Sequence, residues 1–304
     1  MTQQLVGAIE AGGTKFVLAL ARMDGTIVDR ARIDTRSAAE TFPDVRQFFN
    51  SAQDRHGPIS GFGIASFGPI DIDPSSSAYG TFTTTPKPGW SGARFHDALE
   101  PFDAPIIVET DVNGAALGEW LSGAGQRCDT LAYTTVGTGV GTGILHRGKA
   151  RGGISHLEAG HIHIPHDTAR DPFAGRCPFH GDCLEGLVCG PAIIDRWGTS
   201  LDQVSHENSD AVPLIASYLA DFAKTLVLLH MPDRLIFGGG VMKAPGLIEE
   251  VRQQVELRLG AYLQHPRLTS GLTDYIVAPG LGDDAGITGA IELGRRAASA
   301  QPGD

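Results

Sequence analysis

Two glycine–threonine turns, each flanked by apolar segments, constrain the fold of this 304-residue chain more than any other feature. The first turn, residues 10–15, separates the apolar segments 5–9 and 16–21. The second, residues 137–143, separates segments 130–135 and 144–146. Apolar segments joined by a glycine turn are typical of β-hairpins. Because both halves of the chain open in the same way, the sequence predicts a duplicated α/β unit with a cleft between the halves.

The remaining segments alternate between the two regular periodicities. Apolar residues at a spacing of three or four predict helices, and short apolar runs predict buried strands. The expected helices are 41–55, 114–122, 214–230, 247–263 and 285–300. The expected further strands are 26–34, 59–64, 105–109, 234–237 and 275–278.

Composition restricts the classes of partner. With 41% hydrophobic and 19% charged residues the chain has the make-up of a globular protein. Its net charge of −11 argues against a nucleic acid or an anionic membrane as partner, since both require a basic surface. We expect no apolar run of the roughly 20 residues that a membrane span requires. Cys128 and Cys189 lie far apart in apolar contexts, so we expect reduced thiols and a cytoplasmic location.

The glycine turns are candidate phosphate sites. Successive backbone N–H groups in such turns form anion-binding concavities. Thr14, Thr138 and Thr142 could add hydroxyl donors, and Lys15 a positive charge. Neither turn has the spacing of a Walker loop or of the Rossmann fingerprint. Each turn alone is typical of an ordinary hairpin, whereas the two together favour a nucleotide clamp.

Asp111 stands where a buried strand ends and a helix begins. A helix N-terminus stabilises a carboxylate. Asp111 is then either a simple helix cap or a base that accepts a hydroxyl proton during phosphoryl transfer.

A metal-ligand pattern occupies the middle of the chain. Cys177, His180 and Cys183 follow Cys-x2-His-x2-Cys on one polar, turn-rich loop. This arrangement favours a closed tetrahedral zinc site over two ordinary buried cysteines. His161, His163 and His166 are all candidates for the fourth ligand, and His161 and His163 share a face if residues 160–164 form a strand.

These motifs together resemble the ROK family of sugar kinases, within the actin–hexokinase superfamily. The resemblance covers nearly the whole chain, and it includes Glu158, Glu185 and the glycine turn at 237–241. Three departures from the family's glucokinases point to its fructokinase branch: Glu10 where Asp is usual, Thr110 where Asn is usual, and Cys-x2-His-x2-Cys where Cys-x-Cys-Gly is usual. Segments 66–71 and 85–90 point the same way.

The resemblance implies an α/β fold of two actin/hexokinase-like (ribonuclease H-like) domains with an interdomain active-site cleft. We expect a smaller N-terminal domain of residues 1–112 plus 286–304. Residues 113–285 would form a larger C-terminal domain that carries the zinc-binding loop.

The resemblance also implies residue roles. Asp111 would be the catalytic base toward the sugar 6-hydroxyl, and Glu10 would help to place magnesium through water. His161 would complete the zinc site of Cys177, His180 and Cys183 and would also contact sugar. The residues expected to bind ATP and its phosphates are Gly12, Gly13, Thr14, Lys15, Gly137, Thr138, Gly139, Gly239 and Gly240. Those expected to bind sugar are Asn113, Glu158, His161 and Glu185.

We therefore expect an ATP-dependent fructokinase that makes fructose 6-phosphate, with structural Zn2+ and with Mg2+ bound to ATP. Its partners would be fructose and Mg-ATP, with no nucleic acid and no membrane, and the family implies a homodimer. Two alternatives remain open: a kinase for mannose, glucose or an N-acylated amino sugar, and a sugar sensor or scaffold without catalysis. Sugar-stimulated ATP turnover separates the sensor from either kinase.

Overall fold

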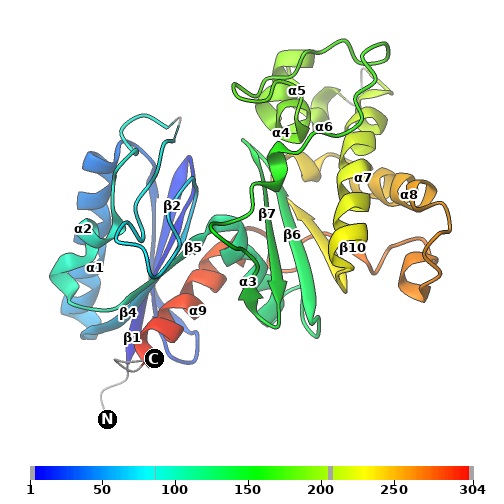
Figure 1. Cartoon of the computed structure of the whole chain (residues 1–304). Helices are drawn as coiled ribbons and strands as arrows, with labels where there is room; N and C mark the ends of the chain where they lie inside the picture. The colour runs from blue at the N-terminus through cyan, green and yellow to red at the C-terminus, as the bar shows by residue number, and fades with distance from the viewer. Residues whose placement is uncertain (1–3, 86, 205–207, 301–304) are drawn as a thin grey trace. The chain divides into compact units, whose positions relative to one another are not determined.

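The structure, a computed structural model, describes residues 4–85, 87–204 and 208–300 (Figure 1). Pro86 of segment 85–90 and the chain ends of the expected N-terminal domain lie outside the described residues. Packing divides the chain into two compact units. Unit 1 comprises Met1–Leu121, Arg151–His156 and Asp283–Asp304, and unit 2 comprises Ser122–Ala150 and Leu157–Gly282. Residues 113–121 thus pack with unit 1, beyond the boundary expected at 112; the expected domain boundaries stay a prediction.

Unit 1 is built on a five-stranded sheet. Its strands are β1 (Leu5–Ala11), β2 (Lys15–Arg22), β3 (Ile27–Asp34), β4 (Ile59–Ser66) and β5 (Ile106–Thr110), in the order β3-β2-β1-β4-β5. β1, β2 and β3 form an antiparallel meander, whereas β4 and β5 run parallel to β1. The carboxyl ends of β1, β4 and β5 therefore lie at one edge of the sheet.

Side-chain size differs between the two faces of this sheet. Phe16, Leu18 and Leu20 of β2 face a large aromatic core under α1 (Ala38–His56), α2 (Phe95–Leu99) and η1 (Glu100–Phe102). The alternate residues Val17, Ala19 and Ala21 face α9 (Ala285–Ser299). Because side chains alternate along a strand, the small residues on one face let α9 approach the sheet closely.

Glycines make that approach possible. A Cβ atom on Gly289 of α9 would lie 1.8 Å from the carbonyl oxygen of Gly114 in α3 (Asp111–Ser122). A Cβ atom on Gly63 of β4 would lie 2.0 Å from the carbonyl oxygen of Ala290. Neither position has room for a side chain, so backbone packs directly on backbone where α9 returns to unit 1.

Unit 2 repeats the sheet topology of unit 1. Its strands are β6 (Thr130–Val136), β7 (Val140–His146), β8 (Lys149–Ala150), β9 (Arg234–Gly238) and β10 (Ile276–Val277), in the order β10-β9-β6-β7-β8. β6, β7 and β8 are antiparallel, and β9 and β10 run parallel to β6 and β9 respectively. This equivalence of β1–β5 with β6–β10 confirms the predicted duplication of an α/β unit.

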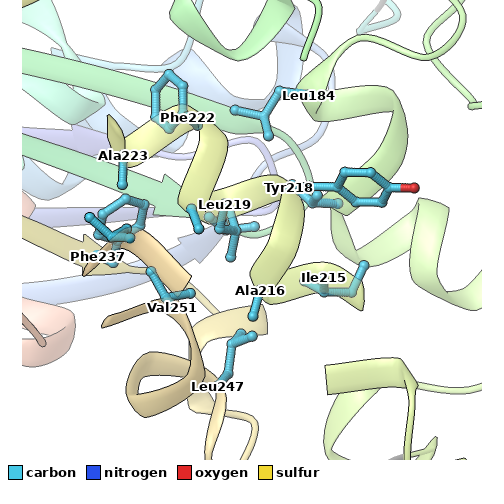
Figure 2. Close-up of a cluster of buried hydrophobic side chains, with 14 of the residues drawn as sticks. Leu184, Ile215, Ala216, Tyr218, Leu219, Phe222, Ala223, Phe237, Leu247 and Val251 are labelled. Carbon is cyan, nitrogen blue, oxygen red and sulfur yellow. The ribbon is translucent and has the colours of Figure 1, made fainter. Parts of the chain in front are cut away.

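Helices pack on one face of the second sheet, and a continuous apolar core lies between them and the sheet. The long helix α7 (Ala211–His230) packs against α8 (Leu247–Leu259) and α4 (Leu184–Val188). Figure 2 shows Leu219 and Phe222 of α7 among buried side chains from these elements and from β9. The shorter helices of this layer are α5 (Gly190–Trp197) and α6 (Leu201–Val204). Single-turn 3-10 segments lie at Ala159–His161, Val241–Lys243, Pro266–Leu268 and Gly282–Asp284.

Helix α7 corrects one expectation from the sequence. It has 20 residues and a mean hydropathy of 1.6 in its most apolar window, enough by length and composition to cross a membrane. Of that window, 56% is buried inside the protein. Its apolar face forms part of the core in Figure 2, so its composition is that of a core helix.

Two further expectations differ from the structure. The second glycine turn is shorter than predicted, because β7 begins at Val140 and includes Gly141 and Gly143. The condition that residues 160–164 form a strand is not met, because Ala159–His161 is a 3-10 turn. The start of β7 is decided by its pairing with β6, which glycine content does not reveal.

We predict that Gly289→Ala lowers the free energy of unfolding by about 2 kcal/mol or more, because the added methyl group overlaps the Gly114 carbonyl. Chemical denaturation measures this change. Gly153→Ala is the control, since a Cβ atom there meets nothing within 4 Å, and it should change stability by about 0.5 kcal/mol or less. Equal effects of the two substitutions would contradict the close contact between α9 and α3.

Candidate active site and metal centre

Two carboxylates lie at the edge of the unit 1 sheet where β1, β4 and β5 end. Ala11, Ser66 and Thr110 are aligned across β1, β4 and β5. Glu10 therefore lies near the end of β1, and Asp111 follows β5 directly as the first residue of α3. Parallel strands present their carboxyl ends at the same edge, where ligands of open α/β sheets commonly bind. The structure thus brings together two predicted site residues that are 101 positions apart in the sequence.

Glu10 has an unusual environment for a carboxylate. Among the described residues its Oε2 atom is buried without a hydrogen-bond partner. Burial, followed by the like charge of Asp111, raises the pKa of Glu10 to about 7, and Lys15 opposes that rise. A Cβ atom on Gly286 would lie 2.6 Å from the Glu10 carboxyl carbon, so α9 packs directly against this group. An orphaned buried carboxylate oxygen fits a role in holding a hydrated cation.

The start of α3 fixes the neighbours of Asp111. The Thr110 hydroxyl accepts a hydrogen bond from the Asn113 N–H at 3.2 Å, and so it caps the helix. The Asn113 side chain donates to Glu109 Oε2 at 2.7 Å. Burial raises the pKa of Glu109, and the hydrogen bond from Asn113 partly offsets this. Glu109 therefore orients the Asn113 amide, a role that the sequence analysis missed.

Hydrogen bonds to backbone carbonyl groups fix the conformation of the first glycine turn. The Gly12 N–H donates to the Lys15 carbonyl at 3.0 Å, closing the turn. The Thr35 hydroxyl donates to the Gly12 carbonyl at 2.7 Å, and the Thr35 N–H donates to the Thr14 carbonyl at 2.9 Å. A Cβ atom on Gly13 would meet nothing within 4 Å, so this side of the turn is open. These contacts leave room for a phosphate group beside the backbone.

The second glycine turn is anchored by a carboxylate. Glu185 Oε2 accepts a hydrogen bond from the Val140 N–H at 2.9 Å, immediately after Gly139. A Cβ atom on Gly139 would lie 2.6 Å from the same oxygen, so a side chain there would displace the Glu185 carboxylate. Glu185, expected to bind sugar, thus also supports the turn expected to bind phosphate.

Two of the expected hydroxyl donors of this turn differ in exposure. Thr138 is exposed at its tip. Thr142 is buried within β7 and forms a hydrogen bond of 3.0 Å with the Thr134 hydroxyl. The expectation that Thr142 could donate to a phosphate was therefore wrong, because the strand directs its side chain into the core.

The glycines after β9 lie beside the same turn. Gly239 has a φ of +93°, which favours glycine. A Cβ atom there would lie 2.3 Å from the Val136 carbonyl oxygen, directly before Gly137. A Cβ atom on Gly240 would meet nothing within 4 Å. The two predicted nucleotide segments of unit 2 thus meet at one end of neighbouring parallel strands.

The four predicted zinc ligands converge in unit 2. One ligand atom from each of His161, Cys177, His180 and Cys183 lies within 4.8 Å of all the others. The Nδ1 atom of His161 is 3.6 Å from the sulfur atoms of both Cys177 and Cys183. The Nδ1 atom of His180 is 3.7 Å from the sulfur atom of Cys177. Tetrahedral zinc with ordinary Zn–S and Zn–N bond lengths separates such S and N atoms by about 3.6 Å. The donor set and spacing therefore fit zinc.

The chemistry of the thiols agrees with a cation site. Burial, with the neighbouring Cys177, raises the pKa of Cys183 to about 11. The Cys183 thiol is therefore protonated at neutral pH unless a cation lies beside it. Zinc binding would release this proton, since the thiolate is the ligand.

The other two candidate histidines have different partners. His166 Nδ1 lies 2.9 Å from Asp182 Oδ2, and His163 Nε2 lies 3.7 Å from Asp182 Oδ1. The hydrogen bond from His166 lowers the pKa of Asp182. His163 and His166 therefore support the loop residue beside Cys183, and His161 alone joins the metal cluster.

A buried ion pair between Asp171 and Arg196 supports the loop that carries the metal cluster. Asp171, 2% exposed, binds both Arg196 Nε at 3.2 Å and Nη2 at 3.0 Å. It also accepts from the Tyr218 hydroxyl at 2.7 Å, and its carbonyl contacts His166 at 3.0 Å. Because every member is paired, these hydrogen bonds offset the cost of burying the charges, and the network links the metal loop to α5 and α7. No sequence motif marked Asp171.

Glu158 lies directly before the 3-10 turn that carries His161, and its carbonyl accepts the His161 N–H at 3.0 Å. Unit 2 thus brings together the metal cluster, the second glycine turn and Glu185. Unit 1 brings together Glu10, Asp111, Asn113 and the first glycine turn.

Two units of one sheet topology, each with a glycine turn after its first strand, define an actin/hexokinase-like protein. The ROK glucokinase of Streptomyces griseus, solved in complex with glucose and AMPPNP, has this fold, with a TM-score of 0.73 and 24% identity over 96% of this chain and 99% of that one. A fructokinase of Zymomonas mobilis is 42% identical over 96% of both chains, and one of Pediococcus pentosaceus is 38% identical over 96% and 98%. The model of the ROK family matches residues 6–297. The chain belongs to the ROK family.

We predict that Cys183→Ser removes bound zinc and lowers the melting temperature, because a hydroxyl group cannot replace a thiolate ligand. Metal analysis of the purified protein and a thermal melt measure the two effects. Cys128→Ser is the control: Cys128 is also buried in unit 2, but it lies outside the cluster. It should keep its zinc, and zinc retained equally by both variants would contradict the assigned ligand set.

We also predict a pH-dependent stability difference for Glu10→Gln. The pKa of Glu10 is about 7 in the folded protein, above its ordinary value of 4.5. The contribution of Glu10 to the free energy of unfolding is therefore fully present below pH 4.5 and is lost as the pH rises through 7. Relative to the variant, the wild type should lose up to about 3 kcal/mol between pH 5 and pH 8 without magnesium. Denaturant unfolding at both pH values tests this, and parallel pH curves would contradict the raised pKa.

Proposed function

We propose that this protein is an ATP-dependent fructokinase that converts D-fructose to fructose 6-phosphate. The observation that carries the proposal is Asp111, a carboxylate at the end of β5 and the start of α3, on the same sheet edge as Glu10 and the first glycine turn. Full-length relatives at about 40% identity are named fructokinases. The three departures at Glu10, Thr110 and the Cys-x2-His-x2-Cys loop support the same branch.

The proposed reaction is an in-line phosphoryl transfer. The fructose 6-oxygen forms a bond to the γ-phosphorus, and the bond from phosphorus to the β,γ-bridging oxygen breaks with its electron pair leaving on ADP. Asp111 accepts the hydroxyl proton. In a loose transition state this base chiefly orients the hydroxyl, and most of the rate comes from position and charge neutralisation.

The glycine turns supply the phosphate contacts in this proposal. Gly12, Gly13, Thr14 and Lys15 of unit 1, with Gly137, Thr138 and Gly139 of unit 2, would lie beside the phosphates. Gly239 and Gly240 would lie by the nucleoside. Magnesium supplies neutralising charge on the phosphate oxygens when it is bound, and Glu10 would hold its hydration shell.

The sugar contacts would come from Asn113, Glu158, His161 and Glu185. Because His161 directs Nδ1 to the sulfur atoms, its Nε2 is on the far side of the ring and would meet a sugar hydroxyl. The Asn113 amide is oriented by Glu109. Zinc would hold the 177–183 loop and the His161 ring in one arrangement, which a small polar loop cannot maintain by packing alone.

The setting of the enzyme is part of this proposal. Four reduced cysteines, two of them in a metal cluster, suit the reducing cytoplasm. The acidic chain would act on small molecules, without a nucleic-acid or membrane partner, and as a homodimer. A non-catalytic sensor is disfavoured because Asp111 and both glycine turns are in place.

We predict that Asp111→Asn lowers the turnover number for fructose-dependent ADP formation by about 10²- to 10⁴-fold, since the amide cannot accept the proton. Fructose affinity by calorimetry should change by less than about threefold. Asp54→Asn, an exposed carboxylate of α1 in the same unit, is the control and should keep full turnover. Full turnover in the Asp111 variant would overturn the assignment of the base.

A further inference from the structure

A lysine outside the glycine turns reaches the first of them. Lys87 lies in the long connection between β4 and α2, 74 positions from Gly13 in the sequence. Its ammonium group donates a hydrogen bond to the Gly13 carbonyl. The same group lies 5.9 Å from the centre of the Phe67 ring. A positive charge is therefore fixed at the tip of the turn on which unit 1 would hold a phosphate.

The connection that carries Lys87 is firmly anchored. Trp90, three residues later, is fully buried, and its indole N–H donates to the Arg36 carbonyl at 2.7 Å. Its ring centre lies 4.8 Å from that of Phe82 and 5.5 Å from that of Phe16, the residue after Lys15 on β2. The Gly89 carbonyl also accepts from the Ala38 N–H at 3.2 Å. Lys87 thus extends from a segment that is packed onto the same hairpin.

In residues 4–85, 87–204 and 208–300, the ammonium group of Lys87 forms no ion pair with a carboxylate. The Gly13 carbonyl accepts a hydrogen bond from one of the three N–H donors of the ammonium group. A carbonyl group is neutral, so this hydrogen bond leaves the positive charge uncompensated. Lys15, by contrast, acts on Glu10, whose pKa it lowers. An anchored, uncompensated cation beside an open glycine turn has the chemistry of an anion contact.

We propose that Lys87 is a catalytic residue whose ammonium contacts the γ-phosphoryl group of the nucleotide during transfer. The inference rests on the proposed kinase function and adds a residue to it. As the bond to the bridging oxygen breaks, negative charge is spread over the γ-phosphoryl oxygens and the leaving ADP. The Lys87 ammonium stabilises that charge without gaining or losing a proton, and fructose supplies the oxygen nucleophile. Gly13, already bonded to Lys87, holds the ammonium beside the phosphate.

Binding measurements isolate the γ-phosphate contact from turnover. In Lys87→Met the affinity for AMPPNP should fall about ten- to hundredfold, whereas the affinity for ADP should change by less than about threefold. Calorimetry with Mg2+ and each nucleotide measures both values. Lys149→Met, an exposed lysine on the short strand β8, is the matched control and should leave both affinities unchanged.

Kinetics supply the second readout. Lys87→Met should lower the turnover number by about 10²- to 10³-fold with little change in the KM for fructose. Lys87→Arg should restore part of the loss, because it keeps the charge. A thermal melt within a few degrees of wild type shows that the variant is folded; a variant that unfolds is replaced by Lys87→Gln in the same measurements.

The outcomes separate this inference from the proposed function. Equal loss of AMPPNP and ADP affinity would assign Lys87 to the structure of the turn and overturn the inference. A raised KM for fructose with unchanged nucleotide binding would make it a sugar contact and overturn it as well. If the wild type forms no ADP with any sugar, the kinase proposal fails, while the difference between AMPPNP and ADP still decides the role of Lys87.

Discussion

Direct backbone packing of α9 against β4 and α3 is the contact on which the architecture depends. Gly63, Gly114 and Gly289 leave no room for a side chain between these elements. The last helix of the chain can therefore return to the unit built by the first 121 residues. The same helix presents Gly286 to the Glu10 carboxyl group and keeps that group away from water. Close packing thus determines both the topology and the electrostatics of the unit 1 site.

Each unit carries its own candidate site residues on the same sheet topology. In each unit the first strand ends in a glycine turn, and parallel strands end at the same edge beside it. Each unit then adds different chemistry to this common frame. Unit 1 adds the carboxylates Glu10 and Asp111 at the strand ends. Unit 2 adds a Cys/His cluster, whose loop is tied to the helical layer through Asp182, His166 and Asp171.

Local sequence chemistry predicted most of the strands, the long helices and three residues of the metal cluster, Cys177, His180 and Cys183, because periodicity, glycine turns and ligand spacing are properties of neighbouring residues. The choice of His161 came from the family resemblance. It could not predict contacts between distant residues. Glu185 and Val140 are 45 positions apart, and Lys87 and Gly13 are 74 positions apart. The turn at 137–143 was predicted too long for the same reason: pairing with β6, not glycine content, decides where β7 begins. The roles given to the site residues depend on family resemblance and stay predictions.

We propose that this ROK-family chain phosphorylates fructose. The most direct test is ADP formation by the purified, zinc-loaded wild-type protein with Mg-ATP and, separately, fructose, glucose, mannose and N-acetylated hexosamines. We predict a rate with fructose far above that with each other sugar. A dominant rate with another sugar would contradict the specificity and keep the fold. A folded, zinc-containing protein without any sugar-dependent rate would contradict the account of Asp111 and the glycine turns as a kinase site.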